Sequence, residues 1–254
     1  MKTFLAMLAR DAHVARRNFI FTHLQTLLQP MLLVFVFGRV MTTAGFMPVH
    51  YKALLLPGVI ALSMILAGVQ SVAMPLISEF QFTRDIEDRL LAPMEIEWLA
   101  VEKVIAGMAQ ALVAGLVVLP SAWLIMGKGV ALDLSHPFLF VGVALLVAAV
   151  AASVGLTLGC SVGQRQIGLM FSLVLAPMIF FGCTYYPWSA LASFPVLSRV
   201  VLANPVVYAS EGFRSALAPQ FPHLPVWAIF IGLIVAVTFF LLFGLHQFRK
   251  KAII

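Results

Sequence analysis

Long apolar runs alternate with short polar segments along almost the whole chain. Six runs are long enough to cross a bilayer as helices, at residues 24–44, 54–77, 101–126, 137–162, 168–187 and 225–247, because about 20 apolar residues span the hydrocarbon core. A helix is the expected form, since it satisfies its own backbone hydrogen bonds in lipid. The pattern predicts an all-α membrane protein with six transmembrane helices.

Composition supports this interpretation. Hydrophobic residues make up 62% of the 254 positions and charged residues 10%, whereas a soluble domain has roughly 45–50% apolar and about 25% charged residues. One apolar run could be a buried helix of a soluble protein, but six in succession would find too little water-facing surface. We expect a single membrane domain over residues 1–254.

Lys and Arg residues are unevenly distributed between the two sides of these spans. Eleven of the sixteen lie in the two terminal tails or next to the segments that follow spans two and four. The side richer in Lys and Arg is cytosolic, so both termini are expected in the cytosol. Within residues 1–22, Phe4, Leu8 and Ala12 recur at helical spacing, which indicates a helix in the membrane interface. The alternative is a basic tail that only sets the topology.

Small residues recur every four positions in two of the spans. Gly107, Ala111 and Gly115 do so in span three, and Gly155 and Gly159 in span four. Such stripes let helices approach closely. They predict that spans three and four pack on each other within one subunit, with a dimer seam as the alternative.

The segment FTRDIEDRLLAP, residues 82–93, is the most charged stretch of the chain. Phe82, Ile86 and Leu90 recur every four residues, and Pro93 ends any helix near its own position. The pattern predicts a short amphipathic helix on the cytosolic face. The residues alone leave a solvated connector open as the alternative.

This segment resembles the loop between the second and third spans of type-2 ATP-binding-cassette (ABC) exporter permeases. In that family a basic residue, an Ile or Leu followed by Glu, and a leucine pair with a nearby proline form the coupling helix that docks on the ATPase. The resemblance implies a cytosolic coupling loop over residues 78–100. Its implied coupling residues are Phe82, Arg84, Ile86, Glu87, Arg89, Leu90, Leu91 and Pro93.

A second resemblance to the same family lies in FFGCTYYPWSALASFPVLSRVVLANPVVYASEGFR, residues 180–214. The resemblance implies re-entrant helices in the outer leaflet between spans five and six, over residues 188–222. The implied outer-gate residues are Gly182, Pro187, Pro195, Asn204, Pro205, Tyr208, Glu211 and Arg214. Independently of the family, the prolines cut this segment into pieces too short to span. Glu211 and Arg214 stand at i,i+3 and can pair on one helical face, so structural pairing is the alternative to a gate.

Polar and aromatic side chains in spans one, two and five are candidates for a substrate path. They are Gln25, Gln29, Gln70, Phe180, Phe181 and Tyr185. Aromatic residues at the end of span five also fit an interfacial belt. The resemblance favours an amphipathic cargo, either a lipid-linked or glycan-bearing molecule or a drug.

The chain has no G-x-x-x-x-G-K-[ST] phosphate cradle, so we expect no ATP hydrolysis and no cofactor in this chain. The resemblance implies a separate cytosolic ABC ATPase that binds ATP and Mg²⁺. Further expected partners are a second copy or a related permease, and membrane lipids, but no nucleic acid and no metal. The expected location is the cytoplasmic (inner) membrane of a bacterium.

A carrier driven by an ion gradient is the alternative function. Such a carrier would need an acidic residue at mid-membrane. None of the six apolar runs has one in its middle, which favours the ATP-driven permease.

Overall fold

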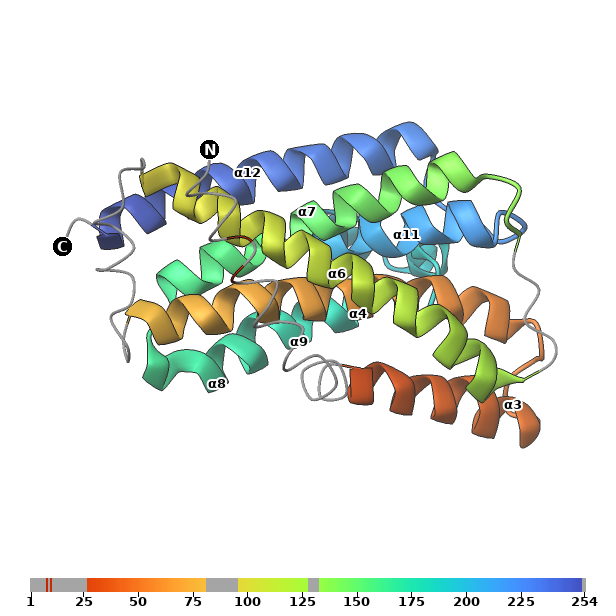
Figure 1. The fold of residues 1–254 in the computed structure, drawn as a ribbon. Coiled ribbons are helices and arrows are strands. Elements are labelled where there is room, and N and C mark those ends of the chain that lie inside the picture. Colours follow the sequence, from red (N-terminus) through yellow and green to blue (C-terminus); the bar gives the residue numbers. More distant parts are fainter. Residues whose placement is uncertain (1–7, 9, 11–26, 81–95, 128–132, 253–254) are drawn as a thin grey trace.

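The computed structural model describes residues 8 and 10 and residues 27–80, 96–127 and 133–252 of the chain. Within these residues every regular element is a helix. The long helices lie side by side in one bundle (Figure 1). The described part is therefore all-α, as the apolar runs predict.

Among the described residues, four helices are long and apolar enough to cross a membrane: α4 (Tyr51–Ser78), α6 (Ile96–Met126), α7 (Pro137–Ser161) and α12 (Val226–Ala252). They have 25 to 31 residues, which corresponds to about 38–47 Å at a rise of about 1.5 Å per residue. This length exceeds a hydrocarbon core of about 30 Å. These helices match predicted spans two, three, four and six, and the chain is a multi-pass membrane protein.

Predicted spans one and five form shorter apolar helices, at Leu27–Thr43 and Ile167–Phe180. The first contains the π-helical segment η1 (Val34–Val40) followed by α3 (Met41–Thr43), and the second consists of α8 (Ile167–Leu169), the π-helical segment η4 (Met170–Leu175) and α9 (Ala176–Phe180). Between α7 and α8 lies one turn, η3 (Gln164–Gln166). π-Helical turns are rare and occur frequently at functional sites.

The predicted range of span five, residues 168–187, is wrong at its end. The helix stops at Phe180 and the chain then turns. Cys183 has a φ of 52°, in the left-handed region that a continuing helix cannot contain. Hydrophobicity therefore extends beyond the helix, because the turn is itself packed against protein.

Helix α4 is the centre of the bundle. In its most apolar window 94% of the residues are buried, against 17% in α12. A Cβ added at Gly107 of α6 would lie 2.2 Å from Val72 Cγ2, and one added at Gly155 of α7 would lie 2.9 Å from the Val69 carbonyl oxygen. Both glycine stripes thus face α4, although α6 and α7 also contact each other. The predicted packing within one subunit is right, but the main partner is α4, where the helices crowd most.

Two cations fix the C-terminal end of α6. Lys52 Nζ donates a hydrogen bond to the Met126 carbonyl at 2.9 Å, and Arg39 Nη1 donates to the Ile125 carbonyl at 3.4 Å. The last carbonyls of a helix have no partner within the helix and carry partial negative charge. The first helix and the start of α4 are thereby tied to α6.

Between the fifth helix and α12 the chain forms four short helices: η5 (Trp188–Ser193), α10 (Pro195–Val200), η6 (Val201–Ala203) and α11 (Pro205–Leu217). The prediction that prolines divide this segment is confirmed. Pro195 and Pro205 each begin a helix, where the missing N–H costs nothing. Helix α11 packs against α4, α7 and α12 (Figure 1), which carries its polar side chains into the bundle.

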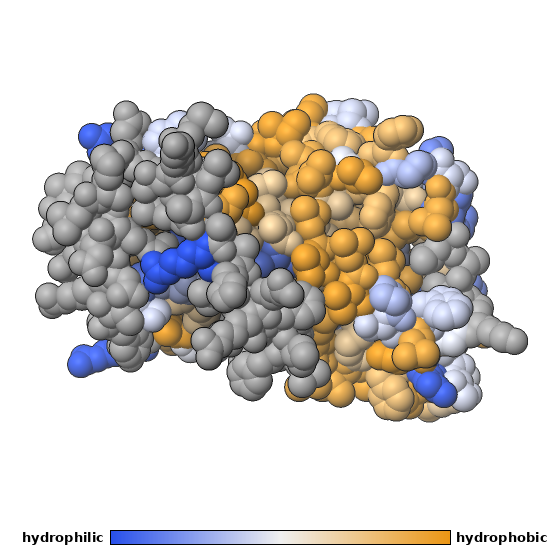
Figure 2. Space-filling model, in the orientation of Figure 1, coloured by the Kyte–Doolittle hydropathy of each residue, from blue (hydrophilic) through white to orange (hydrophobic). Residues whose placement is uncertain are grey.

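On the face shown in Figure 2, apolar side chains form a broad band, and hydrophilic side chains lie toward the two ends. Large exposed apolar residues include Trp227, Ile234 and Phe239 of α12. A face of this kind suits contact with lipid.

Candidate functional site

Helix α11 begins at a built N-cap. The Asn204 side-chain oxygen accepts a hydrogen bond from Val206 N at 3.0 Å, and its amide nitrogen donates to the Met178 carbonyl at 2.7 Å. The first contact satisfies one of the free donors of the new helix. The second ties α11 to α9. This one side chain therefore joins the end of the fifth helix to residues 188–222, which we call the outer segment after the side on which they are predicted to lie.

The turn that precedes the outer segment depends on Gly182. A Cβ at this position would lie 2.5 Å from Val206 Cγ1 and 2.7 Å from the Met178 carbonyl oxygen. No other residue fits this close approach. Asn204 and Gly182, both predicted from the family pattern, therefore act at one junction.

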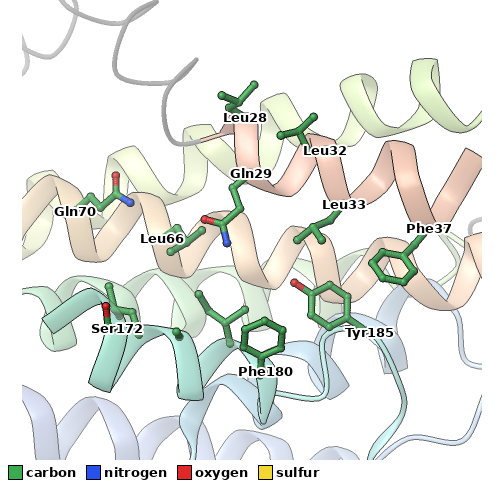
Figure 3. A pocket seen from close by; sticks show the side chains of 13 residues that line it. Leu28, Gln29, Leu32, Leu33, Phe37, Leu66, Gln70, Ser172, Phe180 and Tyr185 are labelled. Carbon is green, nitrogen blue, oxygen red and sulfur yellow. The ribbon is translucent and has the colours of Figure 1, made fainter. Parts of the chain in front are cut away.

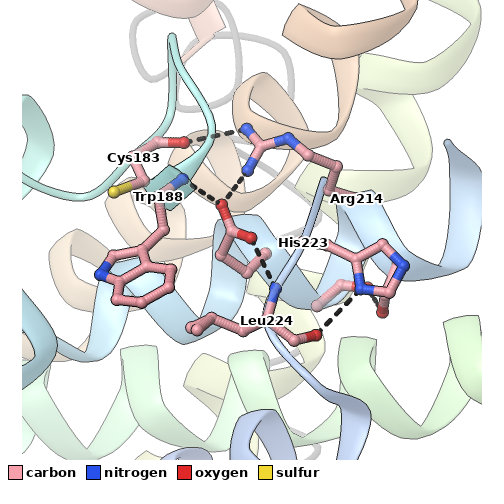
Figure 4. A network of polar contacts seen from close by, with 8 residues as sticks. Cys183, Trp188, Arg214, His223 and Leu224 are labelled. Carbon is pink, nitrogen blue, oxygen red and sulfur yellow. Dashed lines mark hydrogen bonds and ion pairs between the residues drawn. The ribbon is translucent and has the colours of Figure 1, made fainter. Parts of the chain in front are cut away.

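Glu211 and Arg214 form an ion pair inside the bundle, and both side chains are completely buried. The prediction that they pair at i,i+3 is confirmed. Glu211 Oε1 also accepts a hydrogen bond from Trp188 N at 2.8 Å, and Oε2 accepts one from Leu224 N at 2.9 Å (Figure 4). Arg214 Nη2 donates to the Cys183 carbonyl at 3.0 Å.

This outer network connects segments that are far apart in the sequence. The backbone partners come from the turn at Cys183, the start of η5 at Trp188, and Leu224 ahead of α12. Removing two ions from water costs several kcal/mol each, and only good geometry with further hydrogen bonds offsets this cost. The carboxylate meets that condition, because each of its oxygens has a backbone donor. The guanidinium meets it in part, because Arg214 Nε is buried without a hydrogen-bond partner in the described part of the chain.

The remaining predicted outer-gate residues lie around this network without joining it. Pro187 caps η5, Pro195 and Pro205 begin α10 and α11, and the Tyr208 ring lies against Gly232 of α12, where an added Cβ would be 2.6 Å from the ring. Sequence reasoning missed Trp188 and Leu224 as partners of Glu211. No signal in the sequence marks them, because they contribute backbone N–H groups.

A cavity of about 660 Å³ opens between the first helix, α4 and the fifth helix. Figure 3 shows Gln70 and Ser172 at one end, Phe37 and Tyr185 at the other, and Gln29 between them. Four of the predicted path residues, Gln29, Gln70, Phe180 and Tyr185, line this cavity. Phe181 does not line it, and Gln25 lies outside the described residues.

The size and lining of this cavity suit a ligand. Binding cavities have volumes of about 300–1,000 Å³ and a mainly apolar lining with a few placed polar groups. The 13 lining residues here are mostly apolar, and the polar ones are Gln29, Gln70, Ser172 and Tyr185. None of them is Asp, Glu, Lys, Arg or His.

The predicted coupling residues, Phe82 to Pro93, lie outside the described residues. The two helices that this segment joins are described, and they meet in a buried ion pair. Lys103 Nζ of α6 lies 2.9 Å from Glu79 Oε1 at the end of α4, with side-chain exposures of 4% and 11%. Sequence reasoning placed Glu79 in the predicted cytosolic loop, residues 78–100, and counted Lys103 among the cytosolic cations, and it missed the burial of both.

Three further contacts join α12 to the same end of the bundle. Phe80 and Phe248 pack edge to face with ring centroids 5.6 Å apart, and Lys251 Nζ lies 4.9 Å from the centre of the Phe80 ring. Arg249 Nη1 lies 3.8 Å from Glu97 Oε1, and both side chains are well exposed. The C-terminal ends of α4 and α12 and the N-terminal end of α6 are thus held together. In the described part of the chain no group of three or more His, Cys, Asp or Glu side chains is placed to hold a metal ion.

Comparison with known proteins gives a family. A family model described as an ABC-2 type transporter matches residues 2–218. The chain is also 26% identical over 213 residues to the inner membrane transport permease YadH of Escherichia coli (strain K12), and equally to that of Shigella flexneri, over 81% of this chain and 79% of each relative. The chain belongs to the ABC-2 type transporter family.

Proposed function

We propose that this chain is the permease subunit of an ATP-driven exporter in the cytoplasmic membrane of a bacterium. Its cargo is amphipathic, a lipid-linked or glycan-bearing molecule or a drug, and its energy comes from a separate cytosolic ABC ATPase that binds ATP and Mg²⁺. The observation that carries this proposal is the mainly apolar cavity between the first helix, α4 and the fifth helix, in a chain of the ABC-2 family. The two π-helical segments border the same cavity.

Coupling to the ATPase is assigned to residues 82–93. This segment connects the end of α4 to the start of α6, which the Glu79–Lys103 pair holds together. Because α4 also supplies Leu66 and Gln70 to the cavity, a displacement of its end reaches the cavity wall through one helix. The assignment requires both termini and this segment to lie in the cytosol, as the Lys and Arg distribution predicts.

The outer network is assigned to the boundary of the path. Asn204, Glu211 and Arg214 fix the segment that follows the cavity-lining fifth helix. We assign to residues 188–222 the role of closing the outer end, with the network keeping the segment rigid.

A second copy of this chain, or a related permease, covers the cavity side in the assembled transporter. The two short helices that border the cavity carry exposed apolar residues, among them Leu28, Leu32 and Leu173. These residues flank the cavity, so a partner packed on them encloses the path rather than filling it.

The experiment is charge reversal at Glu87, matched with charge reversal at Glu97 on the adjacent start of α6. Glu87→Arg should abolish co-purification with the ATPase and the ATP hydrolysis that depends on cargo, because reversing a desolvated charge at a docking surface costs about 2–5 kcal/mol. Glu97→Arg should have little effect, because Glu97 is exposed and an exposed charge contributes well under about 1 kcal/mol. Equal, small effects of the two substitutions on co-purification and ATP hydrolysis would mean that residues 82–93 are a solvated connector.

The rival function, a carrier driven by an ion gradient, predicts a different result. Cargo movement by such a carrier would continue without ATP and stop when a protonophore collapses the gradient. Movement that requires ATP and the ATPase subunit, with or without the protonophore, supports the permease.

A further inference from the structure

The cavity between the first helix, α4 and the fifth helix combines polar groups with a lining that contains no Asp, Glu, Lys, Arg or His among the described residues. Gln29, Gln70 and Ser172 supply amide and hydroxyl groups, and Tyr185 supplies a phenol. Glutamine and serine both donate and accept hydrogen bonds without carrying charge. The described lining of the cavity therefore offers hydrogen bonds but no counter-ion.

The cavity has a polar part and a mainly apolar, aromatic part. Figure 3 shows the Gln29 side chain entering the cavity from the first helix, while Gln70 lies on α4 at the end occupied by Ser172. Toward the other end lie Leu33 and the rings of Phe37 and Tyr185. The Gln29 amide has no hydrogen-bond partner within the described part of the chain, so it is available to a ligand.

Because the cavity lies among apolar helices, its lack of charged side chains disfavours charged ligands. Its walls are built from apolar helices within the membrane bundle, where an ion that leaves water without a partner loses several kcal/mol. A neutral polar group loses far less and regains it through hydrogen bonds. Charged ligands are thus penalised and uncharged hydrogen-bonding ligands are not.

We propose that this cavity selects an uncharged amphiphile of drug-like size, with its hydrogen-bonding head between Gln29, Gln70 and Ser172 and its apolar part against Leu33 and Phe37. This inference rests on the proposed function and narrows it. Among the amphipathic cargoes, it excludes from this cavity an anionic, phosphate-bearing lipid and a permanently cationic drug. It also assigns Gln29 as the residue that sets charge selectivity.

The test uses three probes with one alkyl chain and different heads: dodecylglycerol, dodecyl phosphate and dodecyltrimethylammonium. Binding is measured on the full-length permease in nanodiscs, as the difference between discs with and without protein, so that partition into lipid cancels. We expect dodecylglycerol to bind at least about tenfold more tightly than either charged probe. Tenfold corresponds to about 1.4 kcal/mol, less than an ion without a partner loses in such a site.

A Gln29→Glu variant sharpens the test, because it places an anion in the cavity with almost no change in size. The variant should bind dodecyltrimethylammonium at least about tenfold more tightly than the wild type does. Gln166→Glu is the matched control, since Gln166 lies in η3 away from the cavity and its side-chain oxygen accepts from Gly163 N, as a carboxylate also can. The control should leave the binding affinities of all three probes unchanged.

The inference is overturned if the wild type binds a charged probe as tightly as dodecylglycerol, if no probe binds, or if Gln29→Glu leaves the affinity for dodecyltrimethylammonium unchanged. Should Gln29→Glu fail to fold, Ser172→Asp tests the same point from the fifth helix. The binding readout needs no ATPase. Absence of ATP-dependent transport would therefore count against the proposed function, while loss of charge selectivity would count against this inference alone.

Discussion

Two buried ion pairs occupy opposite ends of the bundle, and they are built differently. Glu211 and Arg214 lie one turn apart on α11, and their further partners are backbone groups of three other segments. Glu79 and Lys103 lie on different helices, 24 positions apart in the sequence, and join α4 to α6. The first pair organises chain segments around itself, whereas the second connects two helices that are already formed.

The different partners of the two pairs determine how far each pair can move. A carboxylate whose oxygens both accept backbone hydrogen bonds cannot move without leaving buried donors unsatisfied, so the outer network is suited to a fixed boundary. A side-chain pair between two helices can separate when the helix ends move apart. Under the proposed coupling role of residues 82–93, the Glu79–Lys103 pair lies between the two helix ends that would move relative to each other.

The largest effect should come from Glu211→Gln. The substitution removes the counter-ion of Arg214 and places an amide NH₂ group against one of the two backbone donors, Trp188 N or Leu224 N. Breaking a buried pair in this way costs about 3–5 kcal/mol. Unfolding in mixed micelles with increasing SDS would measure the loss, with Glu97→Gln as the matched control at an exposed pair. A loss at Glu211 as small as that at Glu97 would mean that the outer network does not hold the segment.

Much of this arrangement follows from the sequence, but the exceptions have physical reasons. The spacing of Glu211 and Arg214 predicts their pairing, and the prolines predict the short helices. The backbone donors of Trp188 and Leu224 have no side-chain signature, so convergence on Glu211 could not be predicted. The pairing of Glu79 with Lys103 could not be predicted, because the two residues are 24 positions apart and meet only when the helices pack.

The cavity illustrates a second limit. The sequence identifies Phe180 and Phe181 equally, yet only Phe180 lines the cavity. Which side chain faces inward depends on the rotation of the fifth helix. The π-helical segment at Met170–Leu175 changes that rotation, and a helical period of 3.6 residues does not describe it.

A smaller effect is expected from Lys103→Met. The change removes the hydrogen bond from Lys103 to the nearly buried Glu79 carboxylate, and a hydrogen bond to a charged group contributes about 1.5–3 kcal/mol. The double variant Lys103→Met/Glu79→Leu should recover most of this stability, because apolar replacement of a whole buried pair is often neutral. SDS unfolding of the single and double variants would measure the recovery.

The equivalent double variant at the outer pair, Arg214→Met/Glu211→Leu, should not recover. It leaves the N–H groups of Trp188 and Leu224 without their acceptor. Equal recovery at the two pairs would remove the distinction between an organising pair and a connecting pair.

The smallest effect should come from Arg249→Gln, which breaks the third pair, between α12 and α6. Arg249 Nη1 and Glu97 Oε1 are 3.8 Å apart, and the side chains are 66% and 47% exposed. At this exposure water screens the attraction, and such pairs contribute about 0.2–1 kcal/mol. The same unfolding assay should show a loss within that range at low salt and none at about 1 M salt, where the screening length falls to about 3 Å. A loss as large as that of Lys103→Met would mean that the contact between α12 and α6, rather than burial of charge, holds this end of the bundle together.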